Sequence, residues 1–101
     1  MAETLRSGGV EYEATWLRCM AAASFKQEEA IVSVDAVDVP SPLDFFVDRE
    51  LVRPDELLPA AVDGQVKVIV VERNGGTSRV SIPGEPLSFG PQITVRNDLF
   101  I

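Results

Sequence analysis

The side chains in this 101-residue sequence that could do chemistry are carboxylates, two lysines, one tyrosine, one cysteine and hydroxyls. There is no histidine, so Ser-His-Asp and Cys-His catalysis are absent, as is proton transfer by histidine. One cysteine without histidine also excludes zinc sites of the ordinary type. A carboxylate or Lys67 could still catalyse a reaction, but only where a pocket converges on it. We therefore expect no enzyme, no cofactor and no metal.

The acidic residues do not follow the pattern of a catalytic or calcium site. Asp44 and Asp48 are four residues apart, which on a helix is one surface, and such a pair is typical of a solvated face. Asp35, Asp38 and Asp44 lack the Asp-x-Asp-x-Asp-Gly loop with a closing glutamate that holds calcium. The Asn-Gly-Gly sequence at 74–76 is explained by a hairpin turn, and no P-loop lysine follows it.

The cysteine content and the start of the chain bear on the compartment. Cys19 is alone, so it cannot form a disulfide within the chain, and a reducing environment fits. Its expected role is that of a small buried hydrophobic residue. The first residues contain an early acid, Glu3, and no apolar run typical of a signal peptide. No run approaches the ~20 apolar residues of a membrane helix, so we expect a cytoplasmic protein that does not bind a membrane.

The formal net charge of −7 is unevenly distributed along the chain. Residues 1–27 sum to zero, residues 28–64 sum to −8 and residues 65–101 sum to +1. A negative surface repels phosphate backbones, so we expect no direct binding of nucleic acid. The acidic segment is either a solubilising face or a docking surface for a basic partner. Its ten acids are Glu28, Glu29, Asp35, Asp38, Asp44, Asp48, Glu50, Asp55, Glu56 and Asp63.

The first long segment, residues 10–29, is predicted to be a helix. It contains good helix formers, including three consecutive alanines at 21–23. A strand is the competing interpretation, because residues 11–16 also alternate between polar and apolar side chains. The apolar residues at helical spacing are Val10, Ala14, Leu17, Ala21 and Phe25.

A second, shorter helix is predicted over residues 42–52. Ser41 would be its N-cap, Pro42 its first residue, and Asp44 would lie near the positive end of the helix dipole. Pro54 would end the helix. A strand also fits, since apolar residues recur at alternate positions of this segment. On the helix, one face would carry Leu43, Phe46, Val47 and Leu51.

Four segments read as strands. Residues 31–39 are β-branched and end at Pro40, and residues 65–73 and 77–82 flank the Asn-Gly-Gly turn as a hairpin. Residues 92–96 make a last strand, and Asp63-Gly64 reads as a turn. We therefore predict one α+β domain over residues 10–101, after a flexible N-terminus at 1–9. Its two helices would pack on a roughly four-stranded, mainly antiparallel sheet.

The sequence predicts a non-catalytic protein-interaction or assembly subunit that forms homo-oligomers or docks to a protein partner. The apolar C-terminal residues must pack on their own core, on a neighbour's sheet edge or on further sequence. One alternative is an acidic inhibitor acting through residues 28–64, such as an immunity protein, an antitoxin or a nucleic-acid mimic. Another is a winged-helix-like protein-binding module, because the element order is similar. The predicted partner-binding residues are Asp44, Asp48, Asp55, Glu56, Leu99, Phe100 and Ile101.

Overall fold

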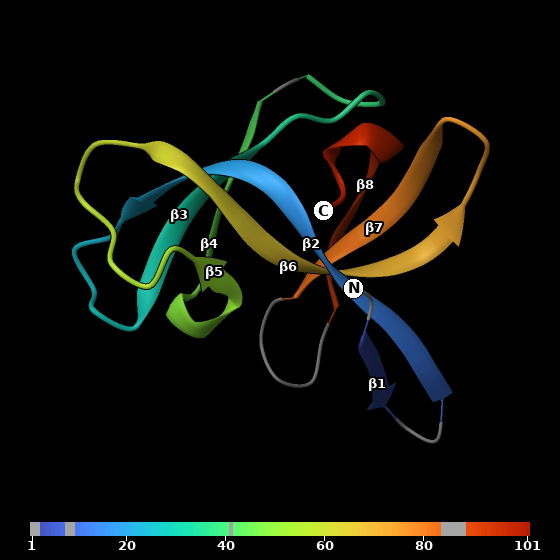
Figure 1. Ribbon diagram of the computed structural model, residues 1–101, viewed down its shortest axis with the longest axis horizontal. Coiled ribbons are helices and arrows are strands. Elements are labelled where there is room, and N and C mark those ends of the chain that lie inside the picture. Colours follow the sequence, from blue (N-terminus) through green and yellow to red (C-terminus); the bar gives the residue numbers. More distant parts are fainter. Residues whose placement is uncertain (1–2, 8–9, 41, 84–88) are drawn as a thin grey trace.

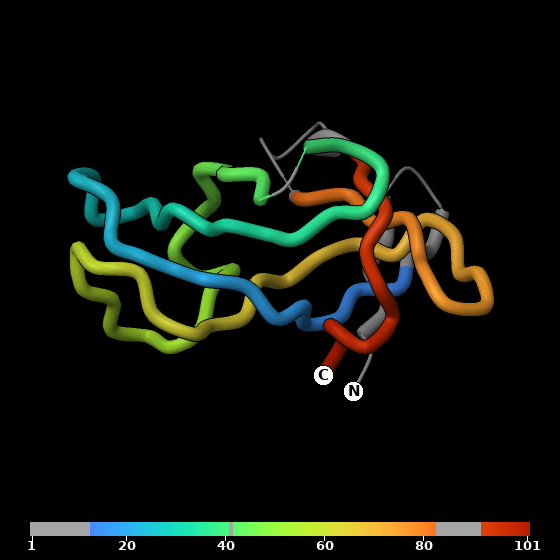
Figure 2. Tube along the Cα trace, turned by 90° about the horizontal axis from the view of Figure 1, so that it is seen from above, coloured from blue at the N-terminus to red at the C-terminus, as the bar shows by residue number. Residues whose placement is uncertain are grey.

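The computed structural model describes residues 3–7, 10–40, 42–83 and 89–101, and the side chains of residues 13–40, 42–82 and 92–101. The described chain is mostly β-strand, and its only helical segments are two short 3-10 turns, η1 (Arg49–Leu51) and η2 (Asn97–Leu99). The strands form one antiparallel sheet that curls into a half-barrel (Figures 1 and 2). The predicted α+β architecture is therefore wrong.

The sheet has the strand order β4-β3-β2-β6-β7-β8, with β1 paired to β2 and β5 paired to β6. All pairs are antiparallel, and the long strands β2 and β6 make the centre of the sheet. The strands are β1 (Glu3–Ser7), β2 (Val10–Ala23), β3 (Glu29–Val34), β4 (Leu43–Asp48), β5 (Val52–Arg53), β6 (Val62–Arg73), β7 (Thr77–Pro83) and β8 (Phe89–Arg96).

Residues 10–29, predicted to be a helix, form β2 and the turn that leads into β3. Leu17 and Ala21 are fully buried on the inner face, while Arg18 and Met20 between them are exposed. Nine consecutive residues of β2, from Glu13 to Ala21, pair with β6. The helix prediction is wrong because the spacing of the apolar residues fits the period of a helix as well as that of a strand. Pairing with the distant strand β6 outweighs the helix propensity of the segment. The preceding segment also contributes a strand, since β1 pairs with β2.

The second predicted helix, residues 42–52, is strand β4 followed by the single turn η1 and by β5. Its side chains alternate: Leu43, Phe45 and Val47 face the core, while their neighbours along the strand are exposed. The local signals for a helix start are outweighed by the pairing of all six residues of β4 with β3. With no helix longer than one turn among the described residues, the winged-helix-like module is excluded as well.

The hairpin at residues 65–82 is confirmed. β6 and β7 are joined at residues 74–76, where the Asn74 N–H donates to the Thr77 carbonyl at 2.9 Å. The predicted turn at Asp63-Gly64 is wrong, because both residues lie within β6, opposite Met20 and Cys19 of β2.

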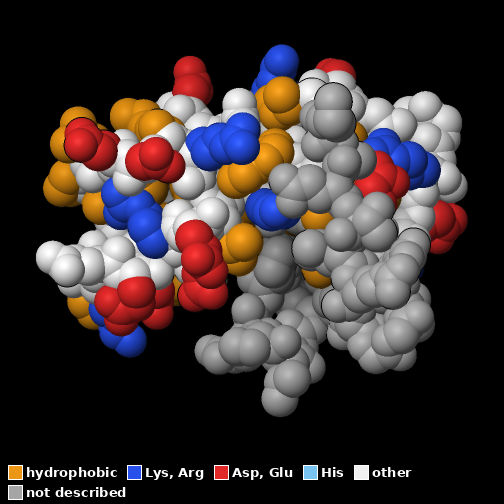
Figure 3. All heavy atoms as spheres, turned by 60° about the horizontal axis from the view of Figure 1, so that its bottom comes forward, with side chains coloured by type: hydrophobic (Ala, Val, Ile, Leu, Met, Phe, Trp, Pro, Cys, Tyr) orange, Lys and Arg blue, Asp and Glu red, His pale blue; other side chains and the backbone are white. Residues whose placement is uncertain are grey.

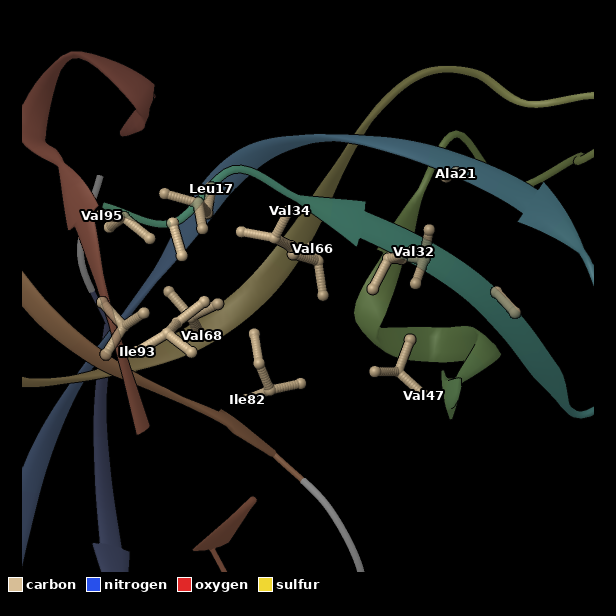
Figure 4. Packing of buried hydrophobic residues seen from close by; sticks show 14 of the residues in the cluster. Leu17, Ala21, Val32, Val34, Val47, Val66, Val68, Ile82, Ile93 and Val95 are labelled. Carbon is tan, nitrogen blue, oxygen red and sulfur yellow. The ribbon is translucent and has the colours of Figure 1, made fainter. Parts of the chain in front are cut away.

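The core lies inside the curl of the sheet and is built mainly from valine (Figure 4). β-Branched side chains suit a pleated, buried surface. Every long strand contributes, and Leu17 is among the largest fully buried side chains. The fully buried or nearly buried apolar residues of the cluster are Leu17, Ala21, Ala30, Val32, Val34, Ala36, Val47, Val52, Val66, Val68, Val70, Val80, Ile82, Ile93 and Val95.

The segment after β3 folds across to the opposite end of the sheet. The Val37 N–H donates to the Thr94 carbonyl at 2.9 Å, and the Thr94 N–H donates to Oδ1 of Asp38 at 3.0 Å. These hydrogen bonds lower the pKa of Asp38 below its usual value, with the bond from the Thr94 backbone as the largest cause. Because the partners of Thr94 come from this segment, the outer edge of β8 is covered at Thr94, near the end of the strand.

Candidate functional site

β4 is the last strand in the order of the sheet, and no described strand pairs with its outer edge. On one side β4 pairs with β3 along its whole length. No residue in the described part of the chain makes a backbone hydrogen bond to its other side. This contrasts with the outer edge of β8, where Val37 and Asp38 bond to Thr94. An open strand edge presents unpaired N–H and C=O groups, which are a template for pairing with another chain.

Three side chains of β4 point away from the core: Asp44, Phe46 and Asp48. They occupy alternate positions of the strand and therefore share one face. The Phe46 side chain is 62 % exposed, so a large aromatic ring lies in solvent between two carboxylates. A charged residue on an edge strand usually protects that strand against pairing. An exposed phenylalanine between two charged residues gives no such protection.

Apolar residues continue from Phe46 across the outer face of the sheet. Ile31 of β3 lies directly opposite Phe46, and Ala22 of β2 lies directly opposite Ile31. Ile31 and Ala22 are half-buried, whereas Phe46 at the edge is the most exposed of the three. The exposed ring is thus the outer end of an apolar row rather than an isolated side chain.

The two carboxylates of β4 are not neutralised within the described chain. Asp44 accepts a hydrogen bond from the Ser33 hydroxyl and makes no ion pair with a described cation. Asp48 lies directly opposite Glu29 of β3, and two like charges in directly opposite positions destabilise a sheet. Glu29 has a cation within reach, since Lys26 Nζ lies 3.9 Å from its Oε1, whereas Asp48 has none among the described residues.

A hollow of about 340 Å³ lies beside the end of β4, lined by Glu28, Asp48, Arg49 and Glu50. Arg49 does not pair with these acids, because its Nη2 donates to the backbone carbonyl of Asp55 at 2.8 Å. Figure 3 shows acidic, basic and exposed hydrophobic side chains close together at the left end of one face, the end where Figure 1 places the β2–β3 turn. Apolar surface at this end of the molecule therefore lies among charged side chains.

The predicted partner-binding residues fall into three places. Asp44 and Asp48 share the outward face of β4, where the structure adds Phe46, a residue that a helix would have put on the core side. Asp55 and Glu56 are exposed in the segment between β5 and β6. The three C-terminal residues lie elsewhere, beside β2. Whether any of these residues binds a partner stays a prediction.

The C-terminal residues fill a gap on one side of β2. On that side β2 pairs with β1 up to Ala14 and with β3 from Met20 onward. In the gap, Leu17 makes a β-bridge with Phe100, and the Ile101 N–H donates to the Trp16 carbonyl at 3.1 Å. Leu99 and Phe100 pack partly buried against the core, whereas Ile101 is 51 % exposed. The C-terminal residues thus pair with β2 of the same sheet.

An ion pair contacts the C-terminal residues at the Phe100 ring. The Arg73 guanidinium pairs with the Glu13 carboxylate and lies 5.0 Å from the centre of the Phe100 ring. The hydrogen bond from Arg73 is the main reason that the pKa of Glu13 is lowered. The group therefore contributes stability above the ordinary glutamate pKa, and this contribution is lost as the pH falls through the folded-state value.

A second hollow, of about 430 Å³, lies on the outer face of β2 and β3. Arg18, Ser33, Asp35 and Asp63 are among its lining residues. Lys67 lies away from it, opposite Trp16. No three His, Cys, Asp or Glu side chains gather as a possible metal site within the described residues. The hollow therefore offers carboxylates and a guanidinium, and the Ser33 hydroxyl on its wall donates to the Asp44 carboxylate.

Cys19 packs against the core, and burial raises the pKa of its thiol to about 12. We expect the native protein at pH 8 to react with iodoacetamide at least about 100-fold more slowly than the protein unfolded in urea. The reason is that the thiolate is the reactive form and is nearly absent at that pH. Mass spectrometry of the labelled protein over time measures both rates. Equal rates in the two states would contradict the burial of this thiol.

The sequence matches no protein-family model, and no curated protein or solved structure shows significant similarity to this chain. No helix in the described part of the chain is long and apolar enough to cross a membrane.

Proposed function

We propose that this protein is a non-catalytic binding subunit that receives an extended segment of a protein partner along the outer edge of β4. The observation that carries the proposal is the open edge of β4 with Phe46 exposed at its centre. In strand addition, main-chain hydrogen bonds supply affinity, and side chains at alternate positions supply specificity. β4 offers both kinds of group on one strand.

The distribution of covered and open edges supports this site over the others. Val37 and Asp38 cover the outer edge of β8 at Thr94, and Phe100 and Ile101 fill the gap on β2. β4 alone among these three has no described segment hydrogen-bonded to its outer edge. An incoming strand would extend the sheet by one position without displacing a described segment.

We expect replacement of Phe46 by threonine to weaken capture of the partner from extracts of the source cells by about tenfold or more. The loss follows because an exposed aromatic residue at the centre of an interface is a typical hot spot. Threonine keeps the strand propensity, and an exposed site changes the free energy of unfolding by no more than about 0.5 kcal/mol. Quantitative mass spectrometry of proteins retained on immobilised wild-type and variant protein measures the effect.

The matched control is Phe25→Thr, because Phe25 is a second exposed phenylalanine, 90 % exposed, in the turn between β2 and β3. A specific partner at β4 is lost with Phe46→Thr and retained with Phe25→Thr. A captured protein that is retained equally by both variants, or lost equally with both, argues against the β4 edge as the binding site.

The acidic inhibitor is the second candidate function, and it is favoured by the carboxylates of Asp44 and Asp48, which make no ion pair with a described cation. An inhibitor of this kind would insert acidic side chains into a basic active site rather than add a strand. Its binding would therefore fall steeply with salt and would survive Phe46→Thr. The capture experiment with Phe46→Thr separates the two functions, because only strand addition at β4 depends on the exposed ring.

A further inference from the structure

We infer that the segment received by β4 carries a basic side chain on each side of an apolar one, at alternate positions: basic-x-apolar-x-basic. The inference rests on the proposed function and goes beyond it by stating the chemistry of the partner. It is drawn from the outward face of β4, which presents carboxylate, aromatic ring and carboxylate in that order at Asp44, Phe46 and Asp48.

The register of an added strand determines which side chains of the partner meet the outward side chains of β4. Residues directly opposite in an antiparallel pair have Cβ atoms about 5 Å apart, so each outward side chain meets one side chain of the incoming strand. An apolar residue opposite Phe46 would cover the exposed ring and continue the row that runs through Ile31 to Ala22. The two residues at alternate positions around it would meet Asp44 and Asp48.

The local charge selects basic side chains at those two positions. Neither Asp44 nor Asp48 has an ion-pair partner within the described chain, and Asp48 faces Glu29 at the directly opposite position of β3. The hollow next to Asp48 adds two acids, Glu28 and Glu50, and one cation, Arg49, whose Nη2 donates to the Asp55 carbonyl. A lysine or arginine opposite Asp48 would make a new ion pair and also offset the repulsion within the sheet. A neutral strand would do neither.

The same geometry disfavours a second copy of this chain on β4. A two-fold pairing centred on Phe46 would put Asp44 of each chain opposite Asp48 of the other, so that four carboxylates meet at two positions. Like charges directly opposite destabilise a pair of strands, and each chain brings a formal net charge of −7. The occupant is therefore a segment of a different, basic protein.

The test uses three capped synthetic heptapeptides that differ only at two positions: Thr-Lys-Thr-Leu-Thr-Lys-Thr, the same peptide with Gln for Lys, and the same peptide with Glu for Lys. Each is titrated into the isotope-labelled protein at low salt, and amide chemical shifts give the site and the dissociation constant. We expect the Lys peptide to shift the amides of β4 and β3. It should bind about fivefold more tightly than the Gln peptide, and the Glu peptide more weakly than either.

The matched pair of variants is Asp48→Lys and Asp98→Lys, which change the net charge equally. Asp98 is exposed in η2, at the C-terminal end of the chain. Asp48→Lys should abolish the preference among the three peptides, because Asp44 remains and each charged peptide then meets one opposite and one like charge. Asp98→Lys should leave the order of the three peptides unchanged.

Three results would overturn the inference. Equal shifts of β4 by all three peptides would show strand addition without the basic requirement, which leaves the proposed function standing. Absence of any shift in β4 with the Lys peptide at millimolar concentration would contradict both the inference and this mode of binding. Concentration-dependent shifts of β4 in the protein alone would assign the edge to a second copy of the chain.

Discussion

Replacement of Gly64 by alanine is expected to lower the free energy of unfolding by about 3 kcal/mol, the upper part of the range for overpacking. A Cβ atom built at Gly64 would lie 2.5 Å from the backbone oxygen of Arg53 and 3.0 Å from the Cβ of Ala21. Real Cβ atoms essentially never approach another heavy atom as closely as the first of these distances. Urea denaturation followed by circular dichroism measures the change.

The cost is high because neither neighbour can move aside easily. The Arg53 oxygen belongs to the backbone of β5, which is held to β6 through the pairs of Val52 with Val66 and Arg53 with Gln65. Ala21 is fully buried and pairs with both Val62 and Val32. Relief of the contact therefore requires β5 to separate from β6, which weakens the packing of Val52 in the core.

The control is Gly76→Ala, in the turn between β6 and β7. A Cβ at Gly76 would have no heavy atom within 4 Å, and its backbone is outside the left-handed region. This change should leave the stability within about 0.5 kcal/mol, or raise it slightly by restricting the unfolded chain. A Gly64→Ala protein as stable as Gly76→Ala would contradict the close approach of β5 to β6.

The sequence predicts the hairpin correctly because its signals are local. Alternate valines at 66, 68 and 70 are buried, and the turn residues 74–76 fall between the two paired strands β6 and β7. β2 has no such unambiguous signal, since Ala14, Leu17 and Ala21 fit a helix as well as parts of a strand. The deciding interaction is the pairing of β2 with β6, about 50 residues away, and no local pattern contains it.

For the candidate site, too, the sequence predicts some residues and misses others. The acidic segment identifies Asp44 and Asp48 whatever the secondary structure, because charge is read directly from the sequence. Phe46 is missed, because a helix over residues 42–52 places it on the core face, whereas a strand turns it outward. Apolar residues at alternate positions of this segment also fit a strand, but the helix-start signals at Ser41 and Pro42 favour a helix.

Replacement of Leu17 by alanine is expected to lower the free energy of unfolding by about 3 kcal/mol, as for other fully buried leucines. Leu17 has an exposed fraction of 0 % and lies where three segments meet, because it pairs with Val66 of β6 and bridges to Phe100 of the tail. Its removal leaves a cavity that β-strands paired on both sides cannot close. Leu58→Ala, at a residue 64 % exposed, is the control and should change stability by no more than about 0.5 kcal/mol.

A double-mutant cycle then measures how far the tail belongs to the core. If Phe100 packs against Leu17, the loss from Phe100→Ala should be smaller in the Leu17→Ala background, with a coupling energy of about 1 kcal/mol. Additive losses would mean that the two residues stabilise the fold independently and that the bridge contributes little. Such a tail could leave the gap on β2 at low cost, and this gap would then be a second open strand edge beside β4.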